Sequence, residues 1–161
     1  ADPQGYEHWV EIYPEKGHWL DRKDAAAIPW MAKFQRNTIP HRVVWYQDDV
    51  TEPRFYWLAV ADDQRKAGTQ IIANRDQQQV TVEAKGVQKI CIRWNDQMAD
   101  LDQPVSITNQ GKQVFTGRVT RTIATLAHTL AERGDPQSVF CAEIEVALAV
   151  EADEETKTSS P

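Results

Sequence analysis

Apolar and polar residues alternate through the middle of the chain, from about residue 38 to about residue 150. Alternation with a period of two is typical of a β-strand that turns one face to a core and the other to solvent. The segments are short and are separated by turn-forming residues, which favours an antiparallel sandwich over βαβ units. The predicted strands are residues 43–46, 54–60, 70–73, 79–84, 87–94, 105–108, 112–116 and 138–148.

Three details of this pattern predict how the strands are buried and joined. The run Phe55-Tyr56-Trp57-Leu58 is apolar without interruption, which predicts a strand that is buried on both faces. Asn109-Gln110-Gly111 predicts a hairpin, because Asn and Gly tolerate a positive φ. Asn74-Arg75-Asp76 predicts a turn between the strands at 70–73 and 79–84.

One segment of this region, residues 119–133, has helical spacing instead. Gly134 predicts the end of the helix, and Asp135-Pro136 prevents its continuation. A lone helix in a β pattern must bury its apolar stripe, so we expect the stripe to plug an open end or edge of the sandwich. The residues of the stripe are Val119, Ile123, Leu126, Ala127 and Leu130.

The first part of the chain has a different pattern. Residues 7–13 predict a short strand that runs into Pro14, and a glycine-containing loop follows. Residues 25–34 are prone to form a helix, but Pro29 lacks the donor that a helix interior needs. We therefore expect either a kink or a restart of the helix with Pro29 at its first position.

Together these patterns predict a mainly-β protein: an antiparallel immunoglobulin-like β-sandwich with one amphipathic helix, preceded by a short strand-loop-helix segment. We expect three regions: 1–37 for the strand, loop and helix, 38–150 for the sandwich, and 151–161 for a disordered tail. The tail is acidic and then rich in Ser and Thr, which is typical of disorder.

Charge and hydropathy exclude two classes of partner. The formal net charge is −6 and no dense run of Lys and Arg occurs, which disfavours nucleic-acid binding. No apolar run approaches the roughly 20 residues that span a bilayer, so we expect no transmembrane segment.

We expect neither a metal nor another cofactor. Cys91 and Cys141 have no Cys/His spacing that fits zinc. Both lie out of phase with the apolar residues of their strands, and either a disulfide or two free thiols fits this placement, so the redox compartment stays open. Asp48, Asp49 and Glu52 form an acidic group, but their spacing does not match an EF-hand and predicts a solvated turn.

The segments Gly17-His18-Trp19-Leu20-Asp21, Asp24-Ala25 and Pro29-Trp30-Met31 resemble the catalytic-histidine loop and closing helix of a bacterial α/β-hydrolase. The relevant types are esterases, polyhydroxybutyrate depolymerases and phospholipase/carboxylesterases. The run from Val43-Val44-Trp45 to Phe55-Tyr56-Trp57-Leu58 is similar to the start of a β domain that such hydrolases carry after that helix.

The resemblance implies that His18 is the general base of a catalytic triad. In α/β-hydrolases the chain order is nucleophile, acid and then histidine. His18 lies near the start of the sequence and no G-x-S-x-G occurs in it, so we expect an upstream hydrolase domain to supply the nucleophile and the acid. The isolated chain is then inactive. His8, His41 and His128 are expected at the surface.

Three functions stay open at this point. The first is the C-terminal portion of a serine hydrolase with an accessory β domain. The second is a carbohydrate- or polymer-binding module, in which exposed tryptophans stack on the ligand. The third is a structural domain that mediates self-association. Large aromatic residues usually supply core or interface area, so we expect Trp45, Trp57 and Trp94 to face a core.

Overall fold

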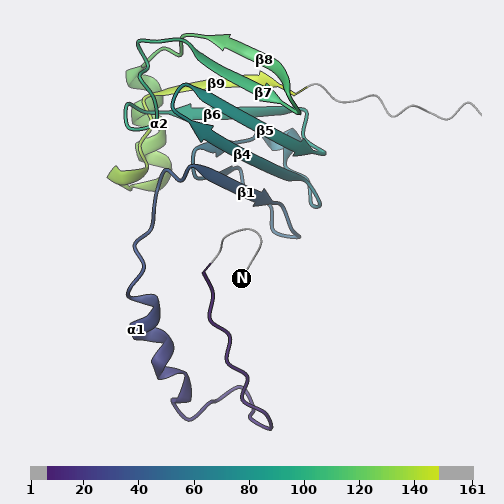
Figure 1. Cartoon of the computed structure of the whole chain (residues 1–161), viewed down its shortest axis with the longest axis vertical. Helices are drawn as coiled ribbons and strands as arrows, with labels where there is room; N and C mark the ends of the chain where they lie inside the picture. The colour runs from purple at the N-terminus through teal and green to yellow at the C-terminus, as the bar shows by residue number, and fades with distance from the viewer. Residues whose placement is uncertain (1–6, 149–161) are drawn as a thin grey trace, which may run out of the picture. The chain divides into compact units, whose positions relative to one another are not determined.

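The computed structural model describes residues 7–148, and the predicted tail at 151–161 lies outside them. The chain separates into two units, Ala1–Arg36 and Asn37–Pro161, each with its own internal contacts. The second unit holds the sheets and the longer helix, and the first unit holds one short helix (Figure 1).

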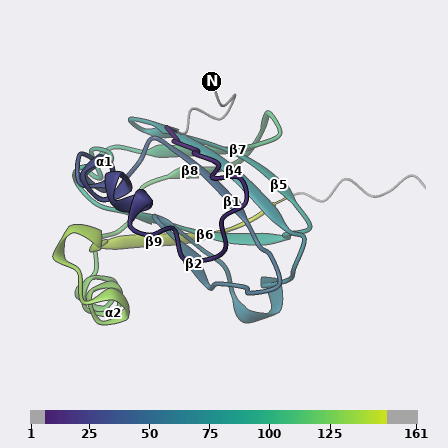
Figure 2. The same cartoon turned by 90° about the horizontal axis from the view of Figure 1, so that it is seen from below.

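The second unit is a sandwich of two sheets, which confirms the prediction of a mainly-β sandwich (Figure 2). The five-stranded sheet has the order β1-β4-β5-β7-β8 and the four-stranded sheet has the order β2-β3-β6-β9. The first sheet consists of β1 (Arg42–Tyr46), β4 (Gln70–Asp76), β5 (Gln79–Lys85), β7 (Val105–Asn109) and β8 (Lys112–Gly117). The second consists of β2 (Arg54–Phe55), β3 (Leu58–Ala59), β6 (Lys89–Trp94) and β9 (Ala142–Ala147).

One apolar core fills the space between the sheets. In β4 and β5 the period-two pattern places alternate residues in this core. Trp45, Trp57 and Trp94 are all buried in it, which confirms the prediction that they face a core. The other large core residues include Val43, Leu58, Ile71, Val80, Val82, Ile90, Ile92, Val105, Ile107 and Phe140.

One strand pair departs from the expected antiparallel arrangement. β5 and β7 run parallel, with Val80 opposite Ile107 and Val82 opposite Asn109. A parallel pair needs a crossover connection. Here the connection passes through β6, which belongs to the other sheet.

The prediction of a single strand at 54–60 is wrong. The segment forms a tight hairpin in which β2 and β3 pair antiparallel, with Arg54 opposite Ala59 and Phe55 opposite Leu58. Tyr56 takes a positive φ of 54° at the turn, and the chain reverses there. The prediction that the whole run is buried on both faces is also wrong, because Trp57 and Leu58 are buried but Phe55 is 37% exposed.

The two other predicted turns have different outcomes. β4 ends at Asp76 and β5 begins at Gln79. The turn between them therefore lies at Gln77-Gln78 and not at the predicted Asn74-Arg75-Asp76. The hairpin between β7 and β8 is confirmed, with Gln110 and Gly111 both at positive φ.

The longer helix, α2 (Ile123–Arg133), is confirmed, and Gly134 ends it in the left-handed conformation. Its predicted orientation is wrong. Ile123, Leu126 and Leu130 are exposed at 86%, 43% and 40%, whereas Thr125 and Thr129 are buried. The Thr129 hydroxyl donates to the carbonyl of Phe140 at 2.9 Å and accepts from its N–H at 3.0 Å. The helix is therefore held to the sandwich through its polar side.

In the first unit, residues 7–13 form no regular secondary structure, so the predicted strand is absent. A 3₁₀ helix, η1 (Lys23–Ala26), leads directly into α1 (Ala27–Met31). Pro29 is the third residue of α1 and not the first. This place is still in the first turn, where a helix N–H has no intrahelical partner, so the helix tolerates the missing donor.

Candidate functional site

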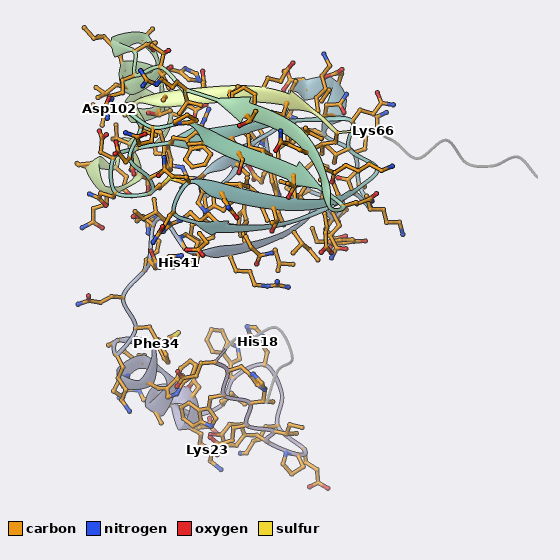
Figure 3. The ribbon with its side chains drawn as sticks, turned by 45° about the horizontal axis from the view of Figure 1, so that its top comes forward. His18, Lys23, Phe34, His41, Lys66 and Asp102 are labelled. Atoms are coloured by element: carbon orange, nitrogen blue, oxygen red, sulfur yellow. The ribbon has the colours of Figure 1, made fainter. Side chains whose placement is uncertain are left out.

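His18 lies on an irregular loop between Pro14 and η1 (Figure 3). Its imidazole makes an edge-on ring contact with Trp19, with the centroids 5.4 Å apart. No carboxylate in the part of the chain that the structure describes lies within ion-pair distance of the imidazole. A general base of a triad needs an acid that fixes its tautomer and orientation. These residues do not provide one.

The backbone of the His18 loop is held by local contacts. Glu15, Asp21 and Arg22 all take positive φ values, which bend the loop on both sides of the histidine. The Lys16 ammonium pairs with the Asp21 carboxylate at 3.3 Å. The Tyr13 hydroxyl donates to the Lys23 carbonyl at 3.1 Å. These contacts join the two ends of the loop, so His18 is presented at its tip.

Aromatic side chains hold the rest of this unit together. Trp30 packs against Trp9 and Phe34, with ring centroids 6.0 and 4.7 Å away. None of residues 7–36 is buried. The exposed large apolar side chains of this unit are Trp9, Val10, Ile12, Trp19, Ile28, Met31 and Phe34. The described part of this unit therefore exposes these side chains and has no core of its own.

Neither serine in the described residues is placed as a hydrolase nucleophile. Ser138 is buried, and its hydroxyl donates to Asp135 at 3.0 Å in the 3₁₀ helix η3 (Pro136–Ser138). Ser106 lies within β7. A nucleophile elbow needs a sharp turn from strand to helix with flanking glycines, and neither serine lies on one.

The other histidines lie at the surface, as predicted. His8, His41 and His128 are exposed. His41 lies where the chain enters the sandwich (Figure 3), and its Nδ1 is 3.3 Å from the Arg75 carbonyl. His128 Nε2 is 3.0 Å from a Glu132 carboxylate oxygen.

The acidic residues after β1 form a turn. The Asp48 carboxylate accepts from the N–H of Asp49, and the Asp49 carboxylate accepts from the N–H of Val50. Glu52 is held through its backbone by the Gln47 side chain. Within residues 7–148 no group of three His, Cys, Asp or Glu side chains is arranged to hold a metal ion. Over the same residues, no helix is long and apolar enough to cross a membrane.

Cys91 and Cys141 are both free thiols, which decides between the two alternatives that the sequence left open. Burial, with the nearby Glu143 carboxylate, raises the pKa of Cys91 to about 12. Burial and Asp96 also raise the pKa of Cys141. Both thiols are protonated at neutral pH, and a protonated thiol is a poor nucleophile and metal ligand.

The outer face of the five-stranded sheet has one hollow of about 610 Å³. It lies where β7 turns away from β5, and its lining includes Gln70, Thr81, Glu83, Lys85 and Thr108 but no aromatic residue. A sugar-binding face needs exposed aromatic rings for stacking, and the sandwich tryptophans are buried. The sandwich therefore has none of its tryptophans in position to stack on a sugar, whereas the exposed Trp9 and Trp19 belong to the first unit.

An ion pair with a buried arginine joins α2 to the four-stranded sheet. Arg93 donates to both Glu132 carboxylate oxygens, at 2.6 and 3.0 Å. Its Nε is 3.5 Å from Glu143, and Arg54 donates to the Glu132 carbonyl at 2.9 Å. Sequence reasoning missed this group because its members lie far apart in the chain. The one available signal was that Arg93 shares the outward phase of Cys91 in β6.

Comparison with models of protein families, with curated proteins and with solved structures finds no match to this chain.

Proposed function

We propose that this chain is the C-terminal portion of a serine hydrolase of the esterase type. In this proposal residues 1–37 complete the catalytic domain and supply His18 as the general base. Residues 38–150 form an accessory β-sandwich. The nucleophile and the triad acid come from a domain outside these 161 residues, which docks on the first unit.

The observation that carries the proposal is the absence of a core in residues 7–36. Seven large apolar side chains are exposed on a segment that buries none of its residues. Each large apolar side chain moved from water into a core stabilises a fold by about 1.5–3 kcal/mol. A docked catalytic domain would cover these side chains. The same docking would bring a carboxylate to the imidazole of His18.

The junction between the two units supports the division into a catalytic piece and an accessory domain. Arg75 is buried, and its guanidinium donates to the carbonyls of Ile39, Pro40 and Met98 at 2.6, 3.3 and 3.4 Å. The Trp57 indole N–H donates to the same Pro40 carbonyl at 2.9 Å. These contacts hold the chain against the sandwich from Ile39 onward, close to the division between the two units at Arg36 and Asn37.

The proposal is tested on the whole polypeptide that the gene encodes, including any coding sequence upstream of Ala1. We expect that sequence to contain a G-x-S-x-G motif followed by an acidic residue. The whole polypeptide should hydrolyse a short-chain nitrophenyl ester. His18→Ala should lower kcat by about 10⁴-fold or more, because the serine then has no base. The matched control is His8→Ala in the same segment, which should keep the activity.

The 161-residue chain serves as the negative arm of the same assay. We expect it to show no turnover above buffer, with or without His18→Ala, because an imidazole cannot replace a nucleophile and an oxyanion hole. An upstream sequence without a nucleophile motif would overturn the proposal. So would an active polypeptide that is indifferent to His18→Ala.

A further inference from the structure

The five-stranded sheet has an opening beside the end of one of its inner strands, β5. This strand lies between β4 and β7 (Figure 1). Its pairing with β4 runs from Gln79 to Lys85, whereas its pairing with β7 ends at Val82. After β7 the chain turns back into β8. The end of β5 after Val82 therefore has a neighbouring strand on one side only.

The backbone of Ala84 points into this opening. Alternate residues of an inner strand bond to opposite neighbours. On the β7 side, the Gln78 carbonyl accepts from the Ser106 N–H at 2.8 Å and the Val82 carbonyl accepts from the Gln110 N–H at 3.0 Å. Ala84 follows Val82 by two residues, so its N–H and carbonyl point the same way. Within residues 7–148 neither group of Ala84 has a backbone partner there.

The hollow of about 610 Å³ lies at this opening, and its volume falls in the range of about 300–1,000 Å³ that is typical of ligand sites. Glu83 and Lys85 line it from β5, and both are exposed. Neither side chain forms an ion pair with another residue of the described chain. A Cβ at Gly111 would meet no atom within 4 Å, so the turn leaves the opening unfilled. The hollow thus offers a backbone donor and acceptor, a carboxylate and an ammonium group.

We propose that this hollow binds a short extended segment of a partner protein, which adds to β5 as an antiparallel strand beside Ala84. Addition of a strand to an open sheet edge is a common mode of peptide recognition, in which backbone bonds give affinity and alternate side chains give specificity. One residue of the segment exchanges both backbone hydrogen bonds with Ala84. The proposal concerns the sandwich alone and does not depend on the role of His18.

The two charges of β5 determine which segment fits. Residues directly opposite one another in an antiparallel pair have their side chains on the same face, where opposite charges stabilise the pair and like charges destabilise it. The residue before the central one lies beside Lys85 and is therefore acidic. The residue after the central one lies beside Glu83 and is therefore basic. The partner segment has an acidic, an uncharged and a basic residue in this order.

The opening is short at both ends. Gly86 takes a φ of 74° directly after Lys85 and ends the strand. At the other end, the Gln110 N–H already occupies the carbonyl of Val82. The segment pairs only with Glu83–Lys85, and each backbone bond or cross-strand charge pair contributes little by itself. We therefore expect weak and rapidly reversible binding.

The test is amide NMR spectroscopy of the isotope-labelled full chain, with the capped peptide acetyl-Thr-Glu-Val-Lys-amide as the probe. We expect the amide signal of Ala84 to shift most and to saturate, because its N–H gains a hydrogen bond. The matched control peptide has Pro in place of Val, so it has no N–H for the Ala84 carbonyl and should leave that signal unchanged. This comparison uses the unmodified chain and does not depend on how a variant folds.

Exchange of the two charges tests the direction of the segment. Glu83→Lys together with Lys85→Glu keeps the net charge and should weaken binding of the probe by about three- to tenfold, because both cross-strand pairs become like-charged. The same variant should bind acetyl-Thr-Lys-Val-Glu-amide in its place. An Ala84 signal that does not shift, equal shifts with the Val and Pro peptides, or indifference to the charge exchange would overturn the proposal. So would a shift with protein concentration alone, because a second copy would then occupy the opening.

Discussion

Arg93 in β6 and Glu132 in α2 form a two-pronged ion pair, with N–O distances of 2.6 and 3.0 Å. The Arg93 side chain is 5% exposed and that of Glu132 is 19% exposed. A buried charge that loses its partner is strongly destabilising, whereas the complete pair can be close to neutral. The largest effect on stability is therefore expected when one partner is removed and the other charge stays buried without it.

Removal of the carboxylate should destabilise the sandwich. We expect Glu132→Ala to lower the free energy of unfolding by about 2–3 kcal/mol, because Arg93 then stays buried with only Glu143 nearby. His128→Ala is the matched control, since it removes an exposed contact to the same carboxylate and should change stability by about 0.5 kcal/mol or less. Urea denaturation measures both. Equal losses for the two variants would contradict the role of Arg93.

The same pair predicts an acid dependence of stability. Burial tends to raise the pKa of Glu132, but hydrogen bonds and charge from Arg93 outweigh it and hold the pKa below its usual value. The carboxylate then contributes stability that is fully present above about pH 4.5, its unfolded range, and is lost as the pH falls through the folded pKa. One such group can change stability by at most about 1.4 kcal/mol per pH unit.

The measurement is a series of urea denaturation curves from about pH 7 to about pH 3, a window that contains the titration of ordinary carboxylates. We expect the unmodified chain to lose more stability below about pH 4.5 than Glu132→Gln does. Parallel curves for the two proteins would show that other carboxylates cause the acid dependence.

The inward side of α2 should matter more for folding than its outward side. Thr129→Val keeps the shape of the side chain but leaves the buried N–H and carbonyl of Phe140 without their partner. We expect a cost of about 2–3 kcal/mol. Leu126→Ala should cost about 1 kcal/mol or less, since Leu126 is 43% exposed. A fully buried leucine would cost about 2–5 kcal/mol on the same substitution.

Chemical denaturation compares these two variants. A larger loss for Leu126→Ala than for Thr129→Val would mean that the apolar side of α2 packs inward after all.

The sandwich should fold without the first unit, provided that the junction is kept. A chain that starts at Asn37 retains the carbonyls of Ile39 and Pro40, and it should unfold cooperatively at nearly the temperature of the full chain. A chain that starts at Arg42 lacks both acceptors. Arg75 then stays buried with only the Met98 carbonyl, and we expect about 2–3 kcal/mol lower stability. Thermal unfolding of the two truncated forms decides this.

Local signals in the sequence predicted the elements whose geometry is set by nearby residues. Gly134 ends α2 because a glycine takes the left-handed conformation without strain, and Gly111 closes the hairpin between β7 and β8 for the same reason. Tyr56 carries no such signal. Tyr56 takes a positive φ and splits the apolar run at 54–60 into two strands. The amino-acid composition of the run does not predict a turn at this position.

Contacts between distant residues account for most of what the sequence did not predict. Helical spacing predicted the apolar stripe of α2, but the hydrogen bonds between Thr129 and Phe140 decide which side faces the sheet. Residues 7–13 have the composition of a strand, yet a strand needs a partner that donates and accepts hydrogen bonds. His18 was predicted from its neighbours along the chain, and its role as a general base stays a prediction.

The parallel pairing of β5 with β7 makes the order of assembly matter. A hairpin closes over its own short turn, but the pairing of β7 with β5 closes a longer loop that contains β6 of the other sheet. Such a pairing loses the entropy of closing a long loop before its stabilising contacts form, which slows folding. The sandwich should therefore reach its native state more slowly than a meander of the same length.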